Sequence, residues 1–94
     1  MATYIVLLDY TDQGIRELRD SPQRADAFTE FAERSGVKIV GQYWTIGSHD
    51  GVLIMEAPGE EVAASVLLHL GTVGNVRTTT LRAFDWAEAR DLIE

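Results

Sequence analysis

The run TYIVLLDY, residues 3–10, is the feature that most restricts how this chain can fold. It is short, rich in β-branched and aromatic residues, and apolar at both sets of alternating positions, which predicts a strand with both faces covered. The same two-sided pattern recurs in a second run, with Val40 and Trp44 on one alternation and Ile39 and Tyr43 on the other. A monomer rarely leaves a whole apolar sheet face in water. The sequence therefore predicts a sheet with helices on one face and a second copy of the sheet on the other.

Hydrophobic periodicity and turn residues predict the order β-α-β-β-α-β plus a terminal helix, which is the split arrangement of a ferredoxin-like sandwich. Strands are expected at 3–10, 37–46, 51–58 and 76–84, and helices from Ser21 to Gly36, over 60–70 and over 86–94. A short helix capped by Thr11 and Asp12 should precede Ser21. The predicted fold class is therefore α+β, a ferredoxin-like domain that forms a dimeric α+β barrel.

Apolar side chains recur at helical spacing in each of the longer predicted helices. The first has the stripe Ala25, Phe28, Phe31, Ala32 and Ser35, and the second has Val62, Ala63, Val66, Leu67 and Leu70. Such stripes are typical of helices that pack on a core. The terminal helix is expected to dock through Trp86, Ala89, Leu92 and Ile93.

Composition limits the class of protein. Ninety-four residues, 46% hydrophobic and 24% charged, predict one globular domain over 1–94. Without cysteine there are no disulfides or thiolate metal sites, and the N-terminus lacks the basic segment and long apolar run of a signal or membrane anchor. A cytoplasmic location is expected. A formal net charge of −7 with scattered basic residues argues against nucleic acid and anionic membranes as partners.

Four segments together resemble the GYD-domain family of small bacterial proteins. They are TYIVLLDYTDQGIRELRDSPQRADAF, the GSHD hairpin, VLIMEAP and GNVRTTTLRAF, and they cover nearly the whole chain. The resemblance implies membership of the dimeric α+β-barrel superfamily and hence a homodimer. The motif that names the family, glycine, any residue, tyrosine and aspartate, falls on residues 47–50, where His49 replaces the tyrosine.

His49 and Asp50 are the candidate catalytic residues, because a carboxylate can orient an imidazole that acts as a general base. The alternative is that Asp50 caps amides of the hairpin and His49 is an exposed tip residue. No metal site is expected, since His49 and His69 lie on different elements without ligand spacing. His69 near a helix C-terminus suits the helix dipole.

Polar side chains of the strands suggest a ligand cleft. If the registers contain no bulge, one side of the strands carries Tyr4, Tyr10, Tyr43, Thr45, Glu56, Thr78, Thr80 and Arg82. The predicted ligand-binding contacts are Tyr43, His49, Thr80, Arg77 and Arg82. The alternative is that the threonines serve β propensity and that Arg82 pairs with Glu56 or an exposed acid.

The function favoured by these features is binding of a small organic or carboxylate ligand by a homodimer. One alternative is a cofactor-free enzyme, as the resemblance to a superfamily with monooxygenases and isomerases implies, with His49 as base and Arg82 or a tyrosine stabilising an enolate-like anion. Another is a structural or regulatory oligomerisation module with a dry interface. No cofactor is expected, because Gly71 and Gly74 lack the following helix and lysine of a phosphate loop.

Overall fold

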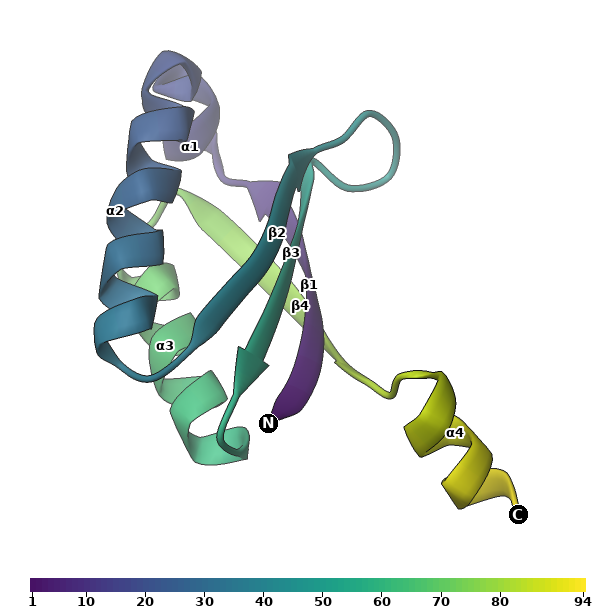
Figure 1. The fold of residues 1–94 in the computed structure, drawn as a ribbon. Coiled ribbons are helices and arrows are strands. Elements are labelled where there is room, and N and C mark those ends of the chain that lie inside the picture. The colour runs from purple at the N-terminus through teal and green to yellow at the C-terminus, as the bar shows by residue number, and fades with distance from the viewer.

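The fold is a four-stranded antiparallel sheet with two helices on one face, seen in a computed structural model that describes residues 1–94. The elements are β1 (Ala2–Tyr10), α1 (Asp12–Arg16), η1 (Leu18–Asp20), α2 (Ser21–Arg34), β2 (Lys38–Trp44), β3 (Gly51–Ala57), α3 (Glu60–Thr72), β4 (Val76–Ala83) and α4 (Trp86–Ile93). The strand order is β2-β3-β1-β4. This is the ferredoxin-like α+β arrangement predicted from the sequence, and Figure 1 shows α2 and α3 on the same side of the sheet.

The core lies between that covered face and the two helices. Val6 of β1 and Leu53 and Met55 of β3 are buried against Ala32 of α2 and Val66 of α3. Of the stripe predicted on α2, Phe28 and Ala32 are buried, Ala25 and Phe31 are half-buried, and Ser35 is exposed. No helix combines the length and the hydropathy needed to span a bilayer.

The segment after β1 is tied to the loop between α3 and β4. Thr11 caps α1 as predicted, since its Oγ1 accepts from the Gly14 N–H at 3.2 Å, and it also donates to the Gly74 carbonyl at 2.6 Å. Gly14 itself lies so close to this loop that a Cβ atom there would be 2.0 Å from the Asn75 carbonyl oxygen. Only glycine allows the two backbone segments to come this close. Their contact sets where β4 begins relative to β1.

A β-bulge in β2 corrects the predicted assignment of side chains to faces. Ile39 is opposite Met55 and Gly41 is opposite Ile54, so Val40 is an extra residue in the strand. The bulge reverses the alternation after it and places Tyr43 on the face away from the helices. Glu56 lies on that face too, opposite Thr3. The expectation that these two share a side with Tyr4, Tyr10, Thr78, Thr80 and Arg82 was therefore wrong.

The connection between β2 and β3 is longer than predicted. Strand β2 ends at Trp44, and Ile46, expected to be within a strand, is fully exposed in the loop with a relative accessibility of 105%. The glycine with a positive φ is Gly47, at 133°, whereas Gly51 lies within β3, so the Asp50-Gly51 pair does not form the turn. The loop projects beyond the sheet (Figure 1).

Helix α4 does not dock on the rest of its own chain, contrary to the prediction. It begins with a capping box in which Asp85 accepts from the Glu88 N–H and Glu88 accepts from the Asp85 N–H. Trp86 and Ile93 are 74% and 85% exposed. Figure 1 shows α4 extending away from the body of the domain.

Candidate functional site

The face of the sheet away from the helices, here called the open face, carries a continuous set of apolar side chains. Gly41, Ile54, Ile5 and Leu81 stand in one row across all four strands. Leu7 and Val52 are opposite each other in the next row. Each of these aliphatic side chains is half-buried or exposed in the single chain. The apolar second face expected from the sequence is therefore present and has no cover within one chain.

Charged residues on the open face are balanced in sign. Asp9 of β1 stands directly opposite Arg77 of β4, and Glu56 of β3 stands opposite Lys38 of β2. Opposite charges in such positions attract across the strands. The open face is thus close to neutral, although the whole chain has a formal charge of −7.

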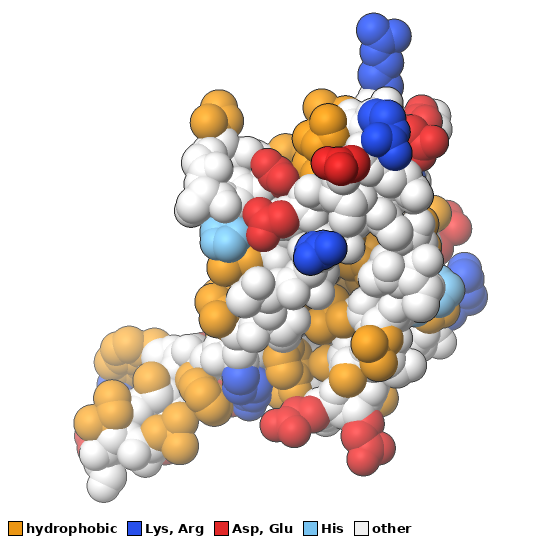
Figure 2. Space-filling model, turned by 180° about the vertical axis from the view of Figure 1, so that it is seen from behind, with side chains coloured by type: hydrophobic (Ala, Val, Ile, Leu, Met, Phe, Trp, Pro, Cys, Tyr) orange, Lys and Arg blue, Asp and Glu red, His pale blue; other side chains and the backbone are white.

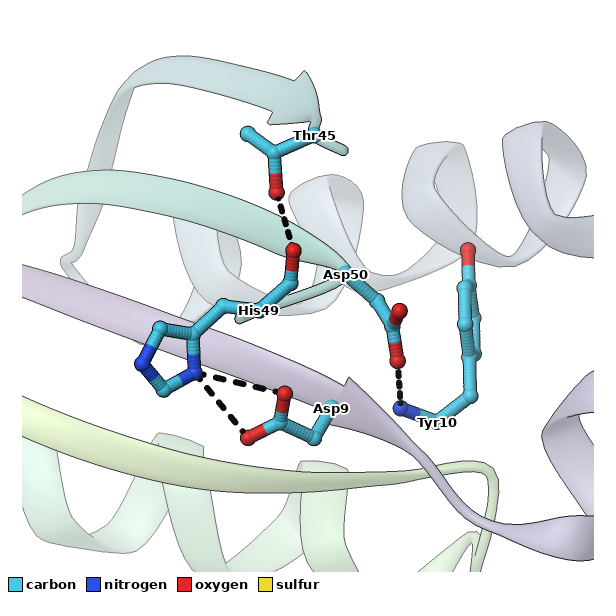
Figure 3. A network of polar contacts seen from close by, with 5 residues as sticks. All are labelled: Asp9, Tyr10, Thr45, His49 and Asp50. Carbon is cyan, nitrogen blue, oxygen red and sulfur yellow. Dashed lines mark hydrogen bonds and ion pairs between the residues drawn. The ribbon is translucent and has the colours of Figure 1, made fainter. Parts of the chain in front are cut away.

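His49 lies at the rim of this face, where its imidazole points toward Asp9 rather than Asp50. Its Nδ1 atom is 3.3 Å and 3.2 Å from the two carboxylate oxygens of Asp9 (Figure 3). The two side chains are 36% and 41% exposed. A carboxylate in this position can orient the imidazole through a hydrogen bond. The sequence has no local signal for this contact, which arises because Asp9 lies near the end of β1 and β1 pairs antiparallel with β3, the strand after His49.

Asp50 has a structural task. Its Oδ2 accepts a hydrogen bond of 2.8 Å from the Tyr10 N–H, and its own N–H donates to the Leu8 carbonyl at 2.9 Å (Figure 3). Asp50 thus caps the end of β1, 40 residues away, rather than amides of its own hairpin. The neighbouring His49 carbonyl accepts from the Thr45 hydroxyl at 2.6 Å, which closes the base of the loop.

The predicted ligand contacts are divided between the two faces of the sheet. Tyr43 and Arg77 are on the open face with His49, whereas Thr80 and Arg82 are on the side of the helices. Arg82 donates to the carbonyls of Thr3 and Ala83, and its guanidinium lies over the Phe84 ring, 4.3 Å from the centroid. The structure has no ion pair between Arg82 and Glu56. Only three of the five predicted contacts therefore share one face of the sheet.

His69 is the second histidine, in the last turn of α3 as predicted. Its ring stacks on Phe31 of α2, with the centroids 3.9 Å apart and an angle of 18° between the planes. This contact joins the two helices. No three side chains among the histidines and carboxylates are grouped in a way that would hold a metal ion.

Comparison with known proteins gives two results. The GYD domain family model matches residues 4–93. The chain is also 38% identical over 89 residues, covering 94% of each protein, to a protein of Thermus thermophilus named glutamine synthetase and cystathionine beta-lyase binding protein.

Proposed function

Because the chain belongs to the GYD-domain family, we propose that it is a homodimeric protein-binding module, with enzymes of amino-acid metabolism as its partners. The observation that carries the proposal is the apolar surface without cover, which comprises the open face, α4 and the exposed Ile46, in a chain 38% identical to a relative named for binding two enzymes. In its specific form, the proposal is that the chain binds glutamine synthetase and cystathionine beta-lyase. The protein then acts where these enzymes are, which we expect to be the cytoplasm.

The open face is assigned to a second copy of the chain. The row of Ile54, Ile5 and Leu81 is apolar, and the charges around it are paired, so two acidic chains can approach through this face without the repulsion of their net charge. Burial of such an apolar face provides the favourable free energy of association that a stable dimer requires. Helix α4 extends beyond the sheet (Figure 1), and its apolar side, visible in Figure 2, is placed to pack on the second copy.

The enzyme-binding surface is assigned to the loop between β2 and β3. Its tip presents Ile46, fully exposed, on a projecting segment whose base is fixed by Thr45 and Asp50. An exposed aliphatic side chain on a projecting loop with a fixed base can fill a pocket of a partner.

We also propose that a small ligand binds between the open faces of the two copies. Tyr43, His49 and Arg77 would line such a cleft, whereas Thr80 and Arg82 lie on the other side of the sheet. This geometry supports a cleft smaller than the one predicted from the sequence.

The test uses purified glutamine synthetase and cystathionine beta-lyase from the source organism, immobilised for biolayer interferometry. The proposal expects saturable binding of the wild-type chain and at least tenfold weaker binding of Ile46→Ser. Leu68→Ser is the matched control, because Leu68 is also an exposed aliphatic residue, with a relative accessibility of 71%, and lies on α3. Absence of binding to both enzymes at tens of micromolar chain would overturn the protein-binding function.

A further inference from the structure

A cavity of about 250 Å³ lies between α2, the end of α3 and the covered face of the sheet. Its apolar wall consists of Leu8, Phe28, Phe31, Leu53, Leu70 and Val73. Roughly eight water molecules occupy this volume in liquid water. The cavity can therefore hold a ligand of about ten non-hydrogen atoms. An apolar cavity of this kind with a few polar groups is the usual form of a small-molecule site.

Arg24 brings a positive charge to the wall of the cavity. Its Nη1 donates to the Glu17 carbonyl at 2.7 Å, but its Nη2 is shielded from solvent and has no hydrogen-bond acceptor. A guanidinium remains protonated in proteins, and its unused N–H groups favour a planar, two-oxygen acceptor. Because Arg24 lines the cavity, a carboxylate bound there would supply such an acceptor for Nη2.

A second donor comes from three side chains that also line the cavity. Ser21 Oγ is 2.7 Å from the Tyr10 hydroxyl and accepts from Trp44 Nε1 at 3.0 Å. The three groups hold three donor hydrogens and make only two bonds to one another. One hydroxyl hydrogen, of Tyr10 or Ser21, is therefore left to donate to a ligand. Ser21 precedes Arg24 by about one turn of α2, so this donor and the guanidinium lie on the same side of the helix.

Asp50 is the acidic residue in the wall, and its position leaves the Arg24 end free for an anion. The Asp50 carboxylate accepts from the Tyr10 backbone N–H (Figure 3), whereas the Tyr10 hydroxyl, at the other end of that side chain, is hydrogen-bonded to Ser21. The Asp50 carboxylate is thus bound to a backbone N–H and makes no hydrogen bond to Ser21 or Arg24.

From this arrangement we infer that the cavity binds a small monocarboxylic acid with a flat apolar body. The carboxylate is bound by Arg24 and the free hydroxyl, and the body packs on Phe28, Phe31 and Leu53. This site lies on the opposite side of the sheet from the open face, and the inference does not depend on the proposed binding of enzymes.

The test is a titration of the ¹⁵N-labelled full chain with phenylacetate, followed by NMR chemical shifts, with phenylacetamide as the neutral ligand of the same shape. Phenylacetate is expected to shift the amide signals of residues around the cavity and to bind about tenfold or more tightly than the amide, because hydrogen bonds to charged groups are the stronger ones. Equal binding of acid and amide, or no shifts with millimolar acid, would overturn the inference.

Two variants and a control locate the site. Arg24→Gln should weaken phenylacetate binding about tenfold or more, whereas Arg34→Gln, at the exposed end of the same helix, should leave it unchanged. Ala25→Leu keeps the charge and fills part of the cavity, so it should also weaken binding if the acid occupies this space. If Arg24→Gln does not fold, Ala25→Leu decides: unchanged affinity in that variant contradicts the inference.

Discussion

The Nδ1 atom of His49 lies 3.2 Å from Oδ2 of Asp9, although the two residues are 40 positions apart in the sequence. The contact joins the loop between β2 and β3 to the end of β1 and leaves both side chains partly in water. A pair of this kind can orient an imidazole without contributing much to folding, because solvent screens its attraction.

His49→Ala is therefore expected to lower the free energy of unfolding by less than about 1 kcal/mol. Urea denaturation followed by circular dichroism measures this value, and the transition should keep its slope because the variant exposes no further surface. A loss of several kcal/mol would show that the Asp9–His49 contact is a main support of the hairpin, contrary to its exposure.

Replacement of the neighbouring Asp50 should have a larger effect. Asp50→Ala leaves the Tyr10 N–H, at the end of β1, without the acceptor that lies 2.8 Å away in the wild type. The expected loss is about 1–3 kcal/mol, the usual cost of an unsatisfied buried donor. Asp50→Asn keeps a side-chain oxygen and should lose less than half as much in the same urea titration. Equal losses for the two variants would indicate that charge, and not the hydrogen bond, is what matters at Asp50.

Gly14 provides a test of the backbone approach that sets the start of β4. In Gly14→Ala the new Cβ would meet the Asn75 carbonyl oxygen at 2.0 Å, so the contact with the loop must open, at an expected cost of more than about 3 kcal/mol. Gly71→Ala is the control, since Gly71 lies in α3 with nothing near its Cβ position. That change should stabilise the chain by about 0.5–1 kcal/mol, because alanine favours helices. Thermal midpoints measured by circular dichroism should move in opposite directions.

The order of the elements was predictable because each depends on local patterns. A short run of β-branched, aromatic and aliphatic residues specifies β1, and the Ser21-Pro22 pair specifies the start of α2. Neither signal depends on residues far away in the sequence. The helix cap at Thr11 was found for the same reason. The fold and the family are therefore contained in short segments of the sequence.

The faces of the strands were not predictable, because the relative register of two strands is a tertiary property. The extra residue Val40 reverses the alternation in β2 and moves Tyr43 to the open face. Neither the bulge nor the partner of His49 has a local signature. The cavity beside Arg24 was missed for a related reason, since it requires α2, α3 and the sheet at their observed distances.

Dimer formation through the open face predicts that a charge in its apolar row prevents assembly. Leu81 of the edge strand β4 is 47% exposed in the single chain, so Leu81→Glu should be tolerated by the monomer fold. In a dimer the same carboxylate would be buried without a partner, which costs several kcal/mol. Light scattering after size exclusion should show the wild type as a dimer and the variant as a monomer. Leu68→Glu, on the outside of α3, should stay dimeric.

The position of α4 gives the last prediction. Trp86 is 74% exposed in the single chain and lies beside Arg90, whose guanidinium is 3.6 Å from the centroid of the indole ring. In a Trp44→Phe variant, Trp86 is the only tryptophan left and reports on this helix. If α4 packs on the second copy, its fluorescence should shift to shorter wavelength as the concentration rises through the dimerisation range, because the indole leaves water.

The same Trp44→Phe chain carrying Leu81→Glu is the control for the fluorescence experiment. It should emit at the longer wavelength at every concentration, since α4 has no second copy to contact. A Trp44→Phe dimer whose Trp86 emission does not change on dilution to monomer would show that the open face assembles without α4. In that case the apolar side of α4 is available to the proposed enzyme partners, and deletion of residues 86–94 should weaken their binding while the dimer remains.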